Sequence, residues 1–258
     1  MQNKIKDFIK KFIPVSAKIY NANMQEMRCL IHDVKNSTNE IYWANVFNSV
    51  INKDSKWLLD KSFAPGRWAV SYLGLYIIYN ILNEAKPKNI LELGSGQSTK
   101  MISQYMACYD DANHLIIEEN ADWLKYFLKE NSLPSNSVIK HLPIETTDIL
   151  NGDMAVTYKN LIETIGDDKY DFILVDGPVP DRIKKHDRID LLKLIPDNLA
   201  PSFCIVFDDF DLSSAANSAE LIMNSLEKSR INYESMIYKS HRHILVICSV
   251  DMKFICSM

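Results

Sequence analysis

A glycine-rich turn directly after an apolar segment is the clearest chemical motif in the sequence. Asn89 to Leu93 form an apolar run with Glu92 inside it, and Gly94 and Gly96 follow at once. Glycines at these two positions allow a tight turn and a close approach of the backbone to a ligand. The N–H groups at the start of the helix expected after them suit a polar or anionic group of that ligand.

Two carboxylates strengthen the prediction of a binding site at this turn. Glu92 lies within an apolar strand, where an unpaired charge is costly, so it must meet cations or N–H donors. A protonated amino group of a ligand would be such a partner. Glu118 ends the next apolar run, where a carboxylate can accept hydrogen bonds from both hydroxyls of a ribose. Glu119 is the alternative residue for that role.

The segment Glu92-Leu-Gly-Ser-Gly-Gln-Ser98 resembles the glycine-rich motif of class I S-adenosylmethionine-dependent methyltransferases. Glu118, with Trp123 five residues later, resembles their ribose-binding acid. Thr99 stands where a nicotinamide-dependent enzyme prefers glycine or alanine, and Ser98 stands where many members have a third glycine. The resemblance implies S-adenosylmethionine as the cofactor. The cofactor-binding residues it implies are Glu92, Gly94, Ser95, Gly96, Gln97, Ser98, Glu118, Glu119 and Asp176.

A second group of acidic residues follows two later apolar runs. Asp176 ends one run before a Gly-Pro turn, and Asp208 and Asp209 end the next. Each aspartate alone is explained by capping a helix or fixing a turn. Three carboxylates at one sheet edge need a cation or a proton between them. Metal-binding acids lie at these strand ends in cation-dependent O-methyltransferases, so the resemblance implies all three as candidate Mg²⁺ ligands.

The segment after Asp176 holds the candidate groups for proton transfer. Asp176 itself and His186 are the predicted catalytic residues, because this segment should overhang the site. A solvated basic loop would have the same composition. The alternatives on the segment are Lys184 and Lys185 as the base, and Arg182 and Arg188 as partners of an acidic acceptor or as solvated side chains.

Short apolar runs alternate with helical stretches over residues 63–258, which predicts βαβ units. We expect an α/β, Rossmann-like fold with a seven-stranded, mostly parallel sheet, its last strand antiparallel, and helices on both faces. A helix is predicted from Ser71 to Lys86, and His241-Arg242-His243 should form a hairpin turn. The predicted strands are Asn89–Leu93, His114–Glu118, Val138–Leu142, Phe172–Asp176, Cys204–Asp208 and Ile244–Cys248.

Residues 1–62 are predicted to form a helical cap on a methyltransferase domain of residues 63–258. Apolar residues alternate with lysines over residues 4–13, which predicts a short basic amphipathic helix ended by Pro14. This helix either docks on the main domain or binds weakly to an anionic membrane surface. A further break is expected at Asn36-Ser37. The aromatic residues that either roof the cofactor or join the core are Trp57, Phe63, Trp68 and Tyr72.

The composition narrows the partners and the compartment. With 29 basic and 33 acidic residues and a net charge of −4, no broad cationic surface is expected, and nucleic acid is not an expected partner. The five cysteines form no Cys-x-x-Cys pair, which favours a reducing cytoplasm. No apolar run reaches the roughly 18 to 20 residues of a membrane span, and no secretory signal is recognisable.

These features predict a methyltransferase that acts on the oxygen of a small hydroxylated acceptor, with Mg²⁺ as an optional second cofactor. The Gly-Ser-Gly-x-Ser-Thr motif with Asp-Gly-Pro resembles a bacterial branch associated with glycan and small-metabolite modification, which implies a sugar hydroxyl as acceptor. An aminopropyl transferase, which shares the fold and uses an acid near Asp176 as base, is one alternative. A non-catalytic cofactor-binding scaffold is the other.

Overall fold

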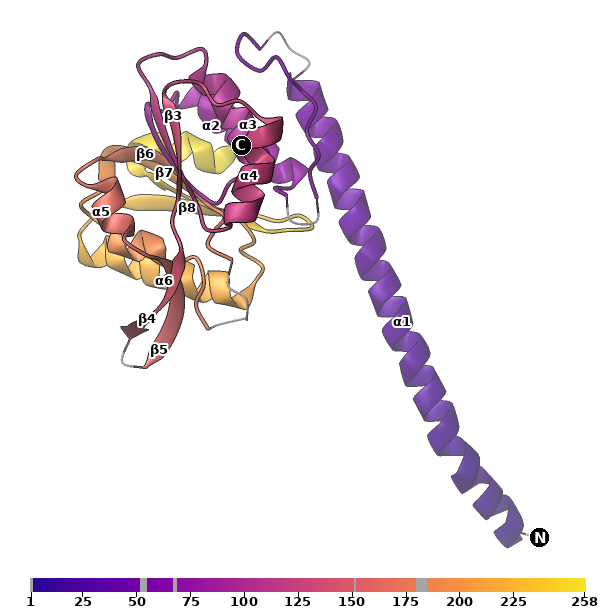
Figure 1. The fold of residues 1–258 in the computed structure, drawn as a ribbon. Coiled ribbons are helices and arrows are strands. Elements are labelled where there is room, and N and C mark those ends of the chain that lie inside the picture. Colours follow the sequence, from indigo (N-terminus) through magenta and orange to yellow (C-terminus); the bar gives the residue numbers. More distant parts are fainter. Residues whose placement is uncertain (1, 52–54, 67–68, 151, 180–184) are drawn as a thin grey trace.

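The computed structural model describes residues 2–51, 55–66, 69–150, 152–179 and 185–258. An α/β domain carries a long N-terminal helix, α1 (Gln2–Ile51), which projects away from it (Figure 1). Within the described residues, no helix is both long enough and apolar enough to cross a membrane.

The domain is built on one seven-stranded sheet with the strand order β3-β2-β1-β6-β7-β9-β8. Only β9 runs against its neighbours, so the predicted mostly parallel sheet with an antiparallel last strand is confirmed. Each of the six predicted strands is present. The strands are β1 (Asn89–Leu93), β2 (Asn113–Glu118), β3 (Ser137–His141), β6 (Tyr170–Val175), β7 (Leu199–Phe207), β8 (Tyr233–Tyr238) and β9 (Ile244–Ser249).

Both faces of the sheet are buried, which explains why its central strands are continuous apolar runs. Successive residues of a strand point to opposite faces. In β6, Phe172 and Leu174 join the core on one face, and Ile173 and Val175 join the core on the other. The first core lies under α2 (Tyr72–Glu84) and α3 (Gln97–Met106), and the second under α5 (Leu161–Ile165) and α6 (Ser213–Lys228). The remaining helices are α4 (Ala121–Glu130) and the 3₁₀ helices Asp190–Lys193 and Val250–Ser257.

Three strands were not predicted. The edge strand β8 exposes most of its side chains, so it lacks the apolar run that marks a central strand. It forms a hairpin with β9, which confirms the turn predicted at residues 241–243. The other two strands, β4 (Ile144–Leu150) and β5 (Asp153–Tyr158), form a separate antiparallel pair that projects from the domain (Figure 1).

The predicted helix stops at Pro14 and at Asn36-Ser37 are wrong, because α1 is continuous from Gln2 to Ile51. A proline removes one helical hydrogen bond at a cost of about 3 kcal/mol, which a long helix can absorb. The side chain of Asn36 donates to the ring of His32, one turn earlier, at 3.1 Å instead of bonding to its own backbone and breaking the helix. The division of the chain at residue 62 stays a prediction.

The helical cap predicted for the N-terminal region is realised only at the C-terminal end of α1. Phe47 and Ile51 are buried in the core beneath α2, and the preceding turns extend into solvent (Figure 1). Trp57 is also buried there, and Phe63 and Tyr72 pack against the same core. Trp68 lies outside the described residues.

Candidate functional site

A pocket of about 430 Å³ lies at the carboxyl ends of β1, β2 and β6. The carboxyl ends of parallel strands meet at one edge of a sheet, and ligands of open α/β sheets bind there. The loops that follow the three strands therefore form one concave surface. The predicted cofactor residues that line it are Gly94, Ser95, Gly96, Gln97, Ser98, Glu118, Glu119 and Asp176.

The two motif glycines have different roles in the turn between β1 and α3. Gly94 has a φ of +95°, which favours glycine, and its N–H donates to the carbonyl of Ile117 at 2.8 Å. A Cβ at Gly94 would lie 3.2 Å from backbone atoms of Asp176 and Gly177. A Cβ at Gly96 would have no atom within 4 Å. Gly94 thus allows close packing of two loops, whereas Gly96 leaves open space beside the pocket.

The carboxylate of Glu118 joins the loops after β1 and β2. One oxygen accepts hydrogen bonds from the N–H and the hydroxyl of Ser95, at 3.0 and 2.6 Å, and the other accepts from the N–H of Asn120 at 2.7 Å. Burial raises the pKa of Glu118, although these hydrogen bonds oppose the shift. Each carboxylate oxygen has two lone-pair directions. Glu118 therefore keeps acceptor capacity toward the pocket.

Glu119 is tied to the opposite wall of the pocket. Its carboxylate accepts from the N–H of Val179 at 2.9 Å and from the hydroxyl of Tyr158 at 3.1 Å. Burial, with the charges of Glu119 and Glu118 nearby, raises the pKa of Tyr158 well above its ordinary value, so the phenol stays a hydrogen-bond donor. Glu119 thus connects the loops after β2 and β6.

Glu92 is fully buried and lies behind the pocket instead of lining it. Its two oxygens contact the hydroxyl of Ser98 at 2.5 Å and Nε2 of His114 at 3.1 Å. His114 was missed by sequence reasoning, and the register explains the contact. His114 is aligned with Ile90, two residues before Glu92 on the same face of β1. The buried charge therefore has a protein partner, and Ser98 links it to the pocket.

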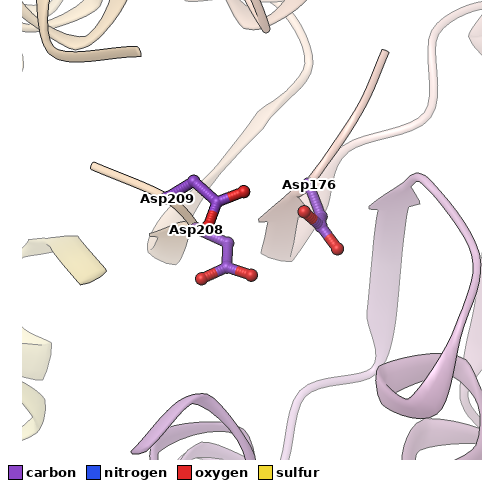
Figure 2. A group of neighbouring side chains, drawn as sticks. All are labelled: Asp176, Asp208 and Asp209. Atoms are coloured by element: carbon purple, nitrogen blue, oxygen red, sulfur yellow. The ribbon is translucent and has the colours of Figure 1, made fainter. Parts of the chain in front are cut away.

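The three predicted metal ligands lie together at the ends of β6 and β7 (Figure 2). One oxygen each of Asp176, Asp208 and Asp209 can be chosen so that all three lie within 4.8 Å of one another. Buried Arg188 donates to Asp209 at 2.8 Å, to Asp176 at 3.3 Å and to the backbone carbonyl of Asp208 at 2.8 Å. Arg242 lies 3.3 Å from the second oxygen of Asp209. Two guanidinium groups therefore face three carboxylates.

The charge balance of this cluster favours a bound proton. Burial, reinforced by the charge of Asp208, raises the pKa of Asp176 well above its ordinary value, while Arg188 opposes the shift. Burial and the charge of Asp209 raise the pKa of Asp208 to about 6. Both oxygens of Asp208 are buried and have no partner among the described residues. The cluster can thus hold and exchange a proton near neutral pH.

Backbone strain also marks the cluster. Arg188 and Asp209 have φ values of 52° and 54°, in the left-handed region that non-glycine residues rarely adopt. Such conformations cost on the order of 1 to 3 kcal/mol each and persist where the surroundings enforce them. The sequence predicts Arg188 either as a partner of an acidic acceptor or as a solvated side chain, and it predicts only a turn at Arg242. The contacts of Arg188 and Arg242 with Asp209 arise because two loops that are distant in the sequence lie together in the folded chain.

The structure places His186 outside the residues that line the pocket. Its side chain is buried beside β5, where Nε2 lies 3.8 Å from a carboxylate oxygen of Asp153. Lys185 is exposed and pairs with the same carboxylate at 2.6 Å. Neither His186 nor Lys185 is therefore among the residues that line the pocket. Arg182 and Lys184 lie outside the described residues.

No protein-family model and no curated protein sequence matches the chain. Among solved structures, it is similar to the O-methyltransferase TomG of Streptomyces achromogenes, involved in tomaymycin synthesis and solved with S-adenosylmethionine. The identity is 14%, the TM-score is 0.56, and the match covers 84% of this chain and 98% of that one. A candidate O-methyltransferase of Klebsiella pneumoniae is 11% identical with a TM-score of 0.54, and the match covers 85% of this chain and 99% of that one. The chain thus has the Rossmann-like fold of these O-methyltransferase structures.

Proposed function

We propose that the protein is an S-adenosylmethionine-dependent methyltransferase that methylates a hydroxyl of a small acceptor. The observation that carries the proposal is the joining of Gly96 and Glu118 in one pocket at the carboxyl edge of this sheet. Gly96 leaves room for a ligand beside the start of α3, and Glu118 offers a carboxylate at the end of β2. A ligand with a polar chain and a ribose suits these two features.

In the proposed complex, Glu118 accepts a hydrogen bond from a ribose hydroxyl. The N–H groups of Gln97 and Ser98 face the carboxylate of the methionine part, because the first N–H groups of a helix lack partners within it. The N–H of Gly96 already donates to the hydroxyl of Thr99 at 2.9 Å. Glu92 acts through Ser98, whose hydroxyl donates a hydrogen bond to the Glu92 carboxylate at 2.5 Å. His114 keeps that buried carboxylate paired whether or not the cofactor is bound.

The reaction would be an in-line displacement at the methyl carbon. The acceptor oxygen forms a bond to that carbon, the carbon–sulfur bond breaks, and the sulfonium becomes the neutral thioether of S-adenosylhomocysteine. Holding the two reactants at attack distance supplies most of the acceleration. The hydroxyl proton must leave, and we propose that the acidic cluster, which can exchange a proton, receives it through Asp176, which lines the pocket.

Mg²⁺ fits the acidic cluster poorly. Among the described residues, the two carboxylate oxygens of Asp208 have no partner, but Arg188 and Arg242 already engage Asp176 and Asp209. A divalent cation within reach of all three carboxylates would have to displace the buried guanidinium of Arg188. We therefore propose that the two arginines and a proton neutralise the cluster, and we assign no step to a metal.

The wall around the cluster supports a small hydroxylated acceptor such as a sugar. Arg188, Asp209 and Asp187 offer polar groups at one end of the pocket, and Val70 and Leu212 add apolar surface. A carboxylate accepts hydrogen bonds from hydroxyl groups. Neighbouring acids already neutralise the positive charge of the buried arginine, so it attracts an anionic acceptor only weakly. A neutral polyol therefore fits this end best.

Calorimetric titration with S-adenosylmethionine and with S-adenosylhomocysteine tests the proposal. We expect saturable binding of both ligands by the full chain. The matched control is Asp111→Asn, an exposed change outside the pocket lining, which should leave both affinities unaltered. If neither ligand binds, the methyltransferase assignment fails. Binding of the decarboxylated cofactor with transfer to a polyamine would instead identify an aminopropyl transferase.

A further inference from the structure

Much of α1 has no covering surface. Every side chain from residue 17 to residue 35 is exposed except that of Met24, which is half-buried. The exposed side chains include large apolar ones, with Tyr20 65%, Ile31 62% and Val34 65% exposed. Isolated helices gain little stability in water, and rows of exposed apolar residues mark interaction sites.

Eight positions between residues 17 and 41 follow a heptad repeat, with intervals that alternate between three and four residues across four heptads. Seven of the eight carry apolar side chains and the eighth is Thr38, whereas the exposed apolar residues Ile19 and Leu30 lie off this seam. Residues spaced in this way remain on one seam only when the helix winds around a partner with the same repeat. The seam consists of Ala17, Met24, Ile31 and Thr38 at the first core position, and Tyr20, Met27, Val34 and Ile41 at the second.

The seam ends where α1 reaches the domain. Ile41 is 63% exposed, whereas Phe47, nearly two turns later on another face of the helix, is buried in the domain core. The two sets of apolar residues therefore serve different neighbours. The face that carries Phe47 anchors the helix, and the heptad seam is left for a partner outside the domain.

We infer that α1 forms a parallel coiled coil with α1 of a second copy of this chain. A second copy necessarily has the same seven-residue repeat, so each apolar residue meets its own equivalent across the seam. The projecting helix keeps the two domains clear of the seam (Figure 1). Parallel pairing places both domains at the same end of the coiled coil.

The charges beside the seam select the parallel orientation. Arg28 and Lys35 occupy the flanking position directly after the second core position. In an antiparallel pair this position faces itself, so the two cations would lie against each other. In a parallel pair it faces the other flank, which is uncharged on α1. That other flank is formed by Asn23, Leu30 and Ser37.

Sedimentation equilibrium of the full chain at micromolar concentration tests the association. We expect a dimer, with twice the mass of the 29.7 kDa chain. Ile31→Lys with Val34→Lys should yield a monomer. The matched control is Gln25→Lys with His32→Lys, which adds the same residue type on the outward face and should stay associated. A monomeric parent protein, or equal dissociation of both double variants, would overturn the inference.

Cysteine crosslinking tests the orientation. In a background with Cys29→Ser and Cys108→Ser, which removes the two exposed cysteines, Tyr20→Cys should form a disulfide-linked dimer on mild oxidation. Ala22→Cys, on the outward face, should not. Residue 20 lies near one end of the seam, so it meets its equivalent only in a parallel pair. An associated protein without this crosslink would refute the parallel arrangement.

Discussion

Replacing Gly96 by valine should abolish cofactor binding without unfolding the protein. A Cβ at Gly96 would have no atom within 4 Å, and its backbone φ of 177° is an extended value that other residues adopt. The valine side chain would instead occupy the space that a ligand needs beside the start of α3. The variant therefore separates the site from the fold.

The expected loss follows from the contacts that the ligand would forfeit. If the methionine carboxylate no longer reaches two N–H groups, and a hydrogen bond to a charged group contributes about 1.5 to 3 kcal/mol, the loss is about 3 to 6 kcal/mol. A loss of that size weakens binding by about 100-fold or more. Titration with S-adenosylmethionine and S-adenosylhomocysteine measures it. Gly96→Ala should show a smaller loss.

Gly94→Val is the instructive contrast. Its φ of +95° and the 3.2 Å distance from an added Cβ to backbone atoms of Asp176 and Gly177 predict a loss of stability as well as binding. Thermal unfolding should therefore show a clear decrease for Gly94→Val and little change for Gly96→Val. A Gly96→Val protein with parental affinity and parental stability would refute the placement of the site.

Three further predictions concern carboxylates. Glu118→Ala should weaken cofactor binding by about 1 to 3 kcal/mol; parental affinity in titration would move the ribose contact elsewhere. Chelation with EDTA should leave methyl transfer unchanged, because Arg188 occupies the cluster, and activity lost on chelation but restored by Mg²⁺ would contradict this. Burial raises the pKa of Asp190 from 3.8 to about 7. The buried side chain therefore favours the folded state fully below pH 4, where it is protonated, and this stability is lost as the pH rises through 7. Asp190→Asn should therefore raise the free energy of unfolding at pH 8 by about 2 to 4 kcal/mol and change it little at pH 4; equal denaturant midpoints at pH 8 would contradict it.

The central sheet was predictable because its signal is local. A parallel strand buried on both faces reads as a continuous apolar run, and the runs at residues 89–93, 172–176 and 204–208 all become strands. The edge strand β8 and strand β4 expose many of their side chains, and β5 buries only its last four residues, Ala155 to Tyr158. Their sequences therefore lack that run, and they were missed.

The stops predicted inside α1 failed for a different reason. Proline and the Asn-Ser pair disfavour a helix locally, but a 50-residue helix spreads such costs over many hydrogen bonds. Residues 17–41 of the same helix contain the heptad repeat, and the break predicted at Asn36-Ser37 falls inside it. A period of seven becomes visible only when the helix is read as continuous.

The parallel strands, the glycine turn after β1 and the carboxylates at the strand ends could be predicted from the sequence, because each depends on neighbours along the chain. The pairing of those carboxylates could not be predicted and is seen only in the folded chain. Glu92 meets His114 through strand register, and Asp209 meets Arg188 and Arg242 through loops that are distant in sequence. A buried charge must be paired, and its partner is a residue that lies close to it in the folded chain, not in the sequence.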